Sequence, residues 1–197
     1  MARAIDIDKR RELAREAVAV LQREGLDAPM STLAEALGIK RPTLLYYFPT
    51  RMAIVENALA DLLTEQALFV VARMSAHDHP LDQLYAQIQG VHAFHHGREE
   101  RVVFLSQAIA AFGVGESRVI EIGNAAFEAQ RAEMKKRLRL AIRQGRMHAC
   151  DPDALLRLVR ATIDGLMVQR VMTRCDLAPV HKFLWEHVLR PLKKTPE

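Results

Sequence analysis

The sequence predicts an all-α protein in which a three-helix N-terminal head precedes a larger helical body. Apolar residues recur at intervals of three and four along most of the chain, which is the periodicity of helices that bury one face. No convincing strand pattern or internal repeat is found. A short stretch that combines cations with aromatic rings, residues 39–51, follows a glycine turn. The chain of 197 residues, 50% hydrophobic and 26% charged, is long enough for a substantial core.

Two helices open the predicted head. The first begins at about Asp8 and ends at Gly25, because glycine is a common C-terminal stop. Its inward positions follow helical spacing: Leu13, Ala17, Val20 and Leu21. The second helix is short, from about Ser31 to Leu37, and Gly38 then makes a turn. Its inward positions are Leu33, Ala34 and Leu37.

The third helix is predicted from about Arg41 to Phe48. Pro42 falls in its first turn, where a missing amide hydrogen costs little, and Pro49 ends it. Lys40 and Arg41 stand at its positive dipole end, where each cation costs about 0.3–1 kcal/mol, and Lys40 supplies no side-chain acceptor at the capping position. We therefore expect an external anion there, and phosphate is the natural candidate. The pattern is typical of the recognition helix of a DNA-binding helix-turn-helix.

The predicted domain organisation is a helix-turn-helix DNA-binding domain over residues 1–51 and a helical ligand-binding and dimerisation domain over residues 52–197. Residues 52–74 form one helix that links the two. Pro80 is well placed to begin the next helix, which bears Leu81, Leu84, Tyr85, Ile88, Val91, His92 and His95. The remaining helices are expected at about residues 102–112, 117–144, 153–174 and 180–192.

The penultimate predicted helix is apolar on more than one face. Its apolar residues are Leu155, Leu156, Leu158, Val159, Ile163, Leu166, Met167, Val168, Val171 and Met172. Such a helix is buried on both sides, and the last helix adds Phe183, Leu184, Trp185, Val188 and Leu192. The simplest arrangement is an isologous four-helix homodimer interface. A helix at the centre of a monomeric bundle is the alternative.

The net charge of +4 and the pI of about 9.3 are poor evidence for nucleic-acid binding. Residues 1–65 hold nine Lys and Arg against ten Asp and Glu, so the head has no basic excess. The excess lies in Arg131, Lys135, Lys136, Arg137, Arg139, Arg143 and Arg146. We interpret that cluster as the solvated face of a long helix, with a second nucleic-acid surface as the alternative.

Several segments resemble the TetR family of bacterial transcriptional regulators. The head resemblance rests on residues 33–44 (LAEALGIKRPTL) and 47–51 (YFPTR). Residues 143–146 (RQGR), 151–154 (DPDA) and 163–166 (IDGL) resemble the family's final body helices more loosely. The resemblance implies an all-helical homodimer that binds a palindromic DNA operator and is released by a small-molecule inducer bound in the body.

The resemblance also assigns roles near the recognition helix. Arg41, Pro42 and Thr43 match base-reading and groove-facing positions, and Arg51 matches a phosphate-contacting position that is usually lysine. Leu45 stands where tyrosine is common, so Tyr46 or Tyr47 is the candidate replacement for its hydroxyl. Lys40 stands where the family often has a capping serine and is expected to contact phosphate. From their spacing alone, Leu44 and Phe48 are expected on the core side.

The inducer pocket is expected inside the helical body and largely apolar. The candidates by placement are Tyr85, Ile88, His92, His95, Phe104, Gln107, Phe112, Phe127, Met134, Asp164 and Met167. Each of these residue types is more often part of a core than a ligand contact. The methionines favour an adaptable cavity, but they do not identify the ligand.

Catalysis, a cofactor and a bound metal are not expected. No nucleophile elbow, Walker loop or HExxH motif is present, and Gly113-Val114-Gly115 does not continue as a phosphate-binding loop. His92 and His96 are one turn apart, but no carboxylate or cysteine at diagnostic spacing completes a metal site. Cys150 and Cys175 fit no disulfide framework, which favours a cytoplasmic protein. No membrane span or signal peptide is expected, because no apolar run is long enough and the first residues lead into charged sequence. The alternative function is a helical small-molecule-binding or enzymatic protein that has lost operator recognition.

Overall fold

The computed structural model describes the backbone of residues 5–112 and 119–194. It describes their side chains except those of residues 105, 106, 108, 109, 111, 112 and 119–126. Within these residues the fold is all-α, as predicted, and the one β-type pairing is an isolated antiparallel bridge between Met147 and Lys193. No helix in these ranges has both the length and the apolar composition needed to cross a membrane.

The first helices are α1 (Ile7–Glu24), α2 (Met30–Ala36), α3 (Arg41–Tyr47) and α4 (Arg51–Met74). They are followed by α5 (Pro80–His95), α6 (Glu99–Phe112), α7 (Val119–Arg143), α8 (Pro152–Thr173) and α9 (Ala178–Leu184). These bounds lie within a few residues of the predicted ones. The exception is the last helix, which becomes a π-helical turn at Trp185–Leu189 and a 3-10 turn at Arg190–Leu192. Pro191 has no amide hydrogen to donate, so regular α-helical bonding cannot continue through it.

The chain divides into two compact units. Residues 1–64 and 104–124 form the first, and residues 65–103 and 125–197 form the second. α4 contributes its first part to one unit and its last part to the other. The domain boundary expected at residue 51 remains a prediction.

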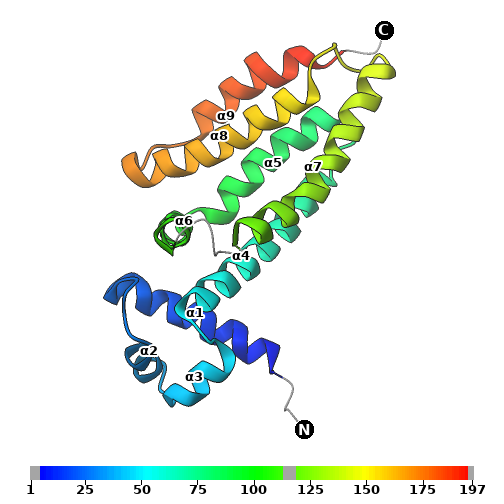
Figure 1. Cartoon of the computed structure of the whole chain (residues 1–197). Coiled ribbons are helices and arrows are strands. Elements are labelled where there is room, and N and C mark those ends of the chain that lie inside the picture. Colours follow the sequence, from blue (N-terminus) through cyan, green and yellow to red (C-terminus); the bar gives the residue numbers. More distant parts are fainter. Residues whose placement is uncertain (1–4, 113–118, 195–197) are drawn as a thin grey trace. The chain divides into compact units, whose positions relative to one another are not determined.

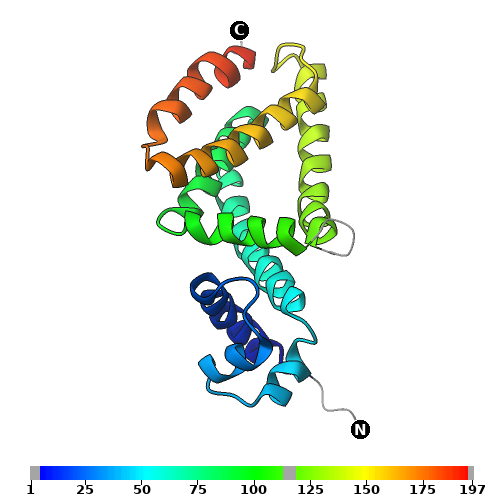
Figure 2. The ribbon, with the colours of Figure 1, turned by 60° about the vertical axis from the view of Figure 1, so that its left-hand side comes forward.

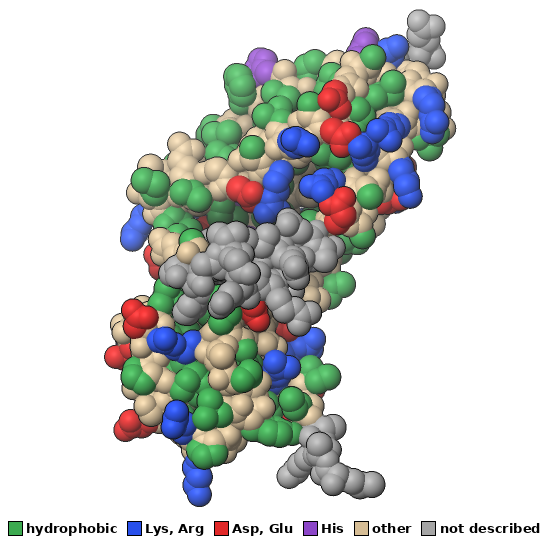
Figure 3. Space-filling view, viewed as in Figure 1, with side chains coloured by type: hydrophobic (Ala, Val, Ile, Leu, Met, Phe, Trp, Pro, Cys, Tyr) green, Lys and Arg blue, Asp and Glu red, His purple; other side chains and the backbone are tan. Residues whose placement is uncertain are grey.

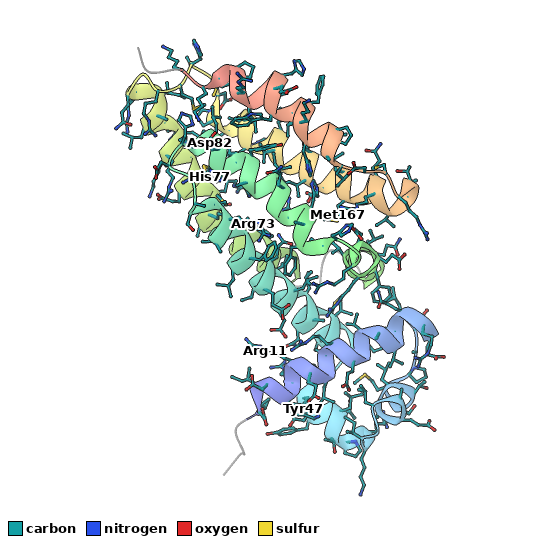
Figure 4. The ribbon with its side chains drawn as sticks, turned by 180° about the vertical axis from the view of Figure 1, so that it is seen from behind. Arg11, Tyr47, Arg73, His77, Asp82 and Met167 are labelled. Atoms are coloured by element: carbon teal, nitrogen blue, oxygen red, sulfur yellow. The ribbon has the colours of Figure 1, made fainter. Side chains whose placement is uncertain are left out.

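The core of the first unit joins α1, α2, α3 and the start of α4 (Figure 2). Its fully buried residues include Leu13, Leu21, Leu33, Leu44, Phe48 and Ile54. Leu44 and Phe48 therefore lie on the core side of α3, as their spacing predicted, and full burial of side chains of this size stabilises by about 1.5–3 kcal/mol each. Arg11 of α1, labelled in Figure 4, pairs with Asp61 of α4 at 3.1 Å.

The core of the second unit is built around α5, which lies beside α8 and α9 (Figure 1). Leu81, Leu84 and Ile88 of α5 are fully buried, and they belong to one apolar cluster with residues of α7 and α8. Met167, labelled in Figure 4, joins this cluster from α8. The helix that the sequence places at Pro80 thus becomes the centre of the unit.

α8 is apolar on two faces, as predicted. Leu155, Val159 and Ile163 are buried, whereas Leu158, Val168 and Met172 have exposed fractions of 47%, 49% and 78%. α9 adds Phe183 at 60%. One apolar face of α8 therefore meets the core of its own chain, and the other is open to solvent.

The basic cluster of the long helix is also placed as predicted. Lys136, Arg139 and Arg143 of α7 are exposed, opposite the buried Leu138 and Ala141. Lys and Arg side chains gather over the part of the second unit that contains α7 (Figure 3). This arrangement is a solvated helix face.

Candidate DNA interface and ligand site

The turn between α2 and α3 is fixed by a complete backbone motif. Gly38 has φ of +65°, and its amide donates to the Glu35 carbonyl at 3.0 Å. The Ile39 amide donates to the Ala34 carbonyl, also at 3.0 Å. These two bonds form a Schellman motif, in which glycine takes the left-handed position. The direction in which α3 leaves α2 is therefore set locally.

The start of α3 presents an exposed, uncompensated positive surface. Lys40 is the N-cap residue and makes no side-chain capping bond, as predicted. Lys40, Arg41, Pro42 and Thr43 are all exposed. Among the described residues, neither Lys40 nor Arg41 has an ion-pair partner. The two cations are thus available to an external anion.

The remaining predicted contact residues of α3 lie at the edge of this surface. Tyr46 is 47% exposed, and its ring stands edge-on to the Tyr47 ring with a centroid separation of 5.3 Å. Tyr47, labelled on α3 in Figure 4, and Leu45 are both half-buried. The Tyr46 ring therefore lies on the solvent side, while Tyr47 and Leu45 divide their surfaces between solvent and protein.

Arg51 has a structural role that sequence reasoning missed. Its Nη1 donates to the carbonyls of Leu26 at 3.1 Å and Ala28 at 3.4 Å, and lies 3.8 Å from the Asp27 carboxylate. The guanidinium thus links the loop after α1 to the first residue of α4. No local pattern indicates this contact, because those carbonyls lie 25 and 23 residues earlier. The predicted phosphate contact of Arg51 remains a prediction.

A buried pair of histidines lies in the second unit. His92 Nε2 is 3.0 Å from the Ile163 carbonyl, and His92 Nδ1 is 2.8 Å from His181 Nε2. A carbonyl only accepts, so His92 Nε2 carries hydrogen, and in the neutral ring His92 Nδ1 must accept from His181 Nε2–H. Burial lowers the pKa of His92, and burial together with the neighbouring His92 lowers the pKa of His181 to about 4. Both rings are therefore neutral near pH 7.

A third buried histidine, His95, lies one turn further along α5. His95 Nε2 donates to Gln66 Oε1 at 2.6 Å. Burial lowers the pKa of His95 to about 4, although the nearby Glu99 carboxylate opposes the shift. Glu99 in turn pairs with Arg170 at 3.0 Å, and Arg170 also contacts His96. Within the described residues, no three His, Cys, Asp or Glu side chains are grouped so as to hold a metal.

A small cleft opens between α5, α7 and α8, with a cavity volume of about 60 Å³. Its apolar walls are Phe127, Met134, Leu156, Val159 and Ile163. Its polar lining is Gln87, Gln130, Arg131 and Arg160. The cleft lies wholly within the second unit.

The cleft contains two of the residues predicted as ligand contacts, Phe127 and Met134. Ile88, His92, His95 and Met167 lie instead in the buried interior of the second unit. The Tyr85 ring packs on the Trp185 ring, with a centroid separation of 5.0 Å, and the Asp164 carboxylate pairs with Arg160 Nε at 2.6 Å. In α6, Phe104 is half-buried and Gln107 is exposed. The side chain of Phe112 lies outside the described residues. The predicted contribution of all these residues to ligand binding remains a prediction.

The polar residues of the cleft were missed by sequence reasoning. Gln87, Gln130, Arg131 and Arg160 resemble ordinary surface residues of amphipathic helices. Their positions along each helix place them at the edge of its apolar stripe. The sequence does not show that the stripe edges of α5, α7 and α8 meet around one cleft.

Comparisons with known proteins agree with this architecture. Residues 13–58, which span most of α1 to the first part of α4, match the family described as bacterial regulatory proteins, tetR family. No curated protein matches the sequence significantly.

Solved structures share the fold over nearly the whole chain. A Saccharomonospora viridis protein solved in complex with choline has a TM-score of 0.73 and 17% identity, covering 96% of this chain and 100% of that chain. The transcriptional regulator FadR from Bacillus subtilis, solved with stearoyl-CoA, has a TM-score of 0.72 and 15% identity, with coverages of 90% and 96%. The TetR family transcriptional regulator PfmR from Thermus thermophilus has a TM-score of 0.65 and 18% identity, with coverages of 92% and 99%.

The family match falls on the helices that carry the exposed cations, and the similar structures extend the same all-α architecture through the body. Residues 13–58 therefore match the tetR family of bacterial regulatory proteins, and the chain as a whole shares its fold with solved transcriptional regulators.

Proposed function

We propose that the protein is a ligand-responsive transcriptional repressor that binds a palindromic operator as a homodimer in the cytoplasm. The observation that carries the proposal is the exposed pair Lys40 and Arg41, which has no ion-pair partner among the described residues and stands at the start of a helix oriented by the Gly38 turn. Such a helix places its first side chains against base edges in the major groove.

Each exposed side chain has a distinct proposed role. Arg41 contacts guanine O6 and N7, a bidentate contact worth about 1–3 kcal/mol of base discrimination. Thr43 contacts a thymine methyl group or a phosphate, and Pro42 lies against the groove. Lys40 contacts phosphate and positions the helix without reading sequence. Tyr46 is the better placed of the two tyrosines to donate a hydroxyl to phosphate, because its ring is exposed.

The proposed dimer forms through α8 and α9. Their exposed apolar residues include Leu158, Val168, Met172 and Phe183, a concentration that isolated soluble chains rarely leave in water. Two copies of this surface would bury each other in an isologous interface. Two heads in one dimer would then match the two halves of a palindrome.

The proposed inducer binds in the helical body. The cleft between α5, α7 and α8 combines apolar walls with a few polar groups, as small-molecule sites do. The structures solved with choline and with stearoyl-CoA support this proposal, because they are proteins of this fold found with small molecules. α4 runs through both units, so it is the element best placed to carry a change from the body to the head.

The test is a selection of DNA fragments from the source genome by the purified full chain. We expect recovery of a short palindrome bound by a dimer, with affinity that falls steeply as salt is raised. Selection of no sequence, together with saturable turnover of a small molecule, would instead support a helical binding or enzymatic protein that has lost operator recognition.

A further inference from the structure

We infer that the cleft between α5, α7 and α8 binds the carboxylate end of a compact organic acid. This inference rests on the proposed function in that it names the chemical class of the inducer. It follows from the charges that line the cleft, the way they are held and the space between them.

Two ionisable side chains line the cleft among the described residues, and both are arginines. Arg131 enters from α7 and Arg160 from α8, and no carboxylate is among the lining residues that the structure describes. The remaining polar lining is the carboxamides of Gln87 and Gln130, which present N–H donors as well as carbonyl acceptors; Gln130 Nε2 donates one of its hydrogens to Met74 Sδ at 3.2 Å. A ligand that enters the cleft thus meets donors that suit an anion.

Arg160 is already oriented along the wall. Its guanidinium lies over the Phe127 ring, 4.9 Å from the centroid, and its Nε donates to Asp164 at 2.6 Å. A stacked guanidinium loses less side-chain freedom when an anion binds, so the site is partly organised in advance.

The acidic partners of the two arginines do not block an incoming anion. Asp164 and Glu128 each lie on the same helix as their arginine, at spacings of four and three residues, and their side chains are more than half exposed. Exposed pairs of this kind contribute about 0–1 kcal/mol. Each guanidinium has five N–H donors, so further donors remain after one bond to its partner.

The Phe127 ring and the two guanidiniums disfavour an organic cation at this position. A quaternary ammonium group would seek an open aromatic face, but the Arg160 guanidinium lies over that ring. It would also lie beside two guanidinium groups, whose paired carboxylates, Asp164 and Glu128, are not among the described lining residues. The two guanidinium groups thus favour a negatively charged ligand over a positively charged one.

The size of the cleft limits the part of the ligand that it encloses. One water molecule occupies about 10–15 Å³ on this measure, so a cavity of about 60 Å³ holds a carboxylate with a few carbon atoms. Met134, Val159 and Ile163 supply apolar contacts for those carbons. A short aliphatic or monocyclic acid fits these limits.

The test compares hexanoate, hexylamine and 1-hexanol by isothermal titration calorimetry on the full chain without DNA at one ionic strength. These probes share a six-carbon body and differ in the end group. We expect hexanoate to bind at least about tenfold more tightly than the other two. Equal or tighter binding of hexylamine or hexanol, or no binding of hexanoate, would overturn the inference.

The variants Arg160→Gln and Arg131→Gln should each weaken hexanoate binding by about tenfold or more. Arg157→Gln is the matched control, because Arg157 is an exposed arginine of α8 outside the cleft. Circular dichroism checks that each variant folds, and Arg160→Lys serves as a second variant that keeps the charge without the planar donor pair. Unchanged hexanoate affinity in folded Arg160→Gln and Arg131→Gln would contradict the assignment.

Release of a selected operator fragment is measured separately with the same hexanoate. If hexanoate binds through Arg131 and Arg160 but does not release DNA, the ligand class stands and the inducer role in the proposed function fails. If hexanoate does not bind while the chain still recognises its operator, the ligand class fails and the DNA-binding role stands.

Discussion

His92 and His181 lie on α5 and α9 with their facing ring nitrogens 2.8 Å apart and their rings nearly parallel, at an interplanar angle of 6°. The Ile163 carbonyl of α8 fixes the direction of the hydrogen bonds through both rings. Three helices of the second unit are therefore joined by one buried polar chain. Such a chain is stabilising only while every member has its partner.

Replacement of His181 by leucine should destabilise the protein by about 1–3 kcal/mol, because it leaves buried His92 Nδ1 without a donor. The measurement is the free energy of unfolding in urea at neutral pH. His187→Leu is the control, since His187 is exposed on the turn that follows α9. Removal of both buried rings, in His92→Leu with His181→Leu, should cost less than the sum of the two single changes. Equal stabilities of His181→Leu and His187→Leu would refute the role of the pair.

Stability should fall as the pH is lowered from about 6.5 to about 4. Burial lowers the pKa of His95 and His181 to about 4, so within this window the unfolded chain binds protons that the folded chain does not. Each such proton costs about 1.4 kcal/mol per pH unit, and no loss occurs above the unfolded pKa, where both states are neutral. Urea unfolding at several pH values measures the slope. His95→Gln should reduce it, and an unchanged slope in that variant would contradict the buried neutral state.

The variant Arg41→Ala should weaken operator binding and relax base preference at one position of each half-site, at a cost of about 1–3 kcal/mol per contact. Lys40→Ala should instead weaken binding to all sequences and reduce the salt dependence. The measurement is fluorescence anisotropy with the selected operator and single-base variants at several salt concentrations. Arg23→Ala, which removes an exposed cation of α1, should have little effect. A uniform loss of affinity in Arg41→Ala would exclude base reading.

A glutamate at Met172 or Phe183 should convert the dimer to monomer, because either change places a charge in the proposed apolar interface. Analytical ultracentrifugation measures the mass of each variant. Leu68→Glu is a matched control, because Leu68 is 71% exposed on α4 and lies outside the last two helices. Dimerisation that survives both changes, or that is lost equally in Leu68→Glu, would exclude an interface through α8 and α9.

Replacement of Arg51 should destabilise the head even without DNA. Arg51→Met removes the donors to the Leu26 and Ala28 carbonyls and should lower the free energy of unfolding by about 1–2 kcal/mol. Arg51→Lys keeps the positive charge but not the guanidinium geometry. Compared with Arg51→Met, it should therefore recover more of the DNA affinity than of the free energy of unfolding. Urea unfolding and DNA affinity are measured on the same preparations. Wild-type stability in Arg51→Met would show that the loop does not depend on this contact.

The helices and the head were predictable because their signals are local. Leu44 and Phe48 are one turn apart, so their common burial follows from helical periodicity. Gly25 and Gly38 take positive φ values where the sequence places helix stops. The two apolar faces of α8 were likewise predictable, because the positions of its apolar residues do not fit one helical stripe.

The contacts that join distant helices were decided by tertiary structure. His92 and His181 are separated by 89 residues, and each belongs to an ordinary amphipathic pattern on its own helix. Arg131 and Arg160 resemble solvated surface cations until α5, α7 and α8 meet around one cleft. Periodicity determines which face of each helix is buried, because it is a property of neighbours along the chain. It does not determine which faces meet, because that depends on the packing of side chains far apart in sequence.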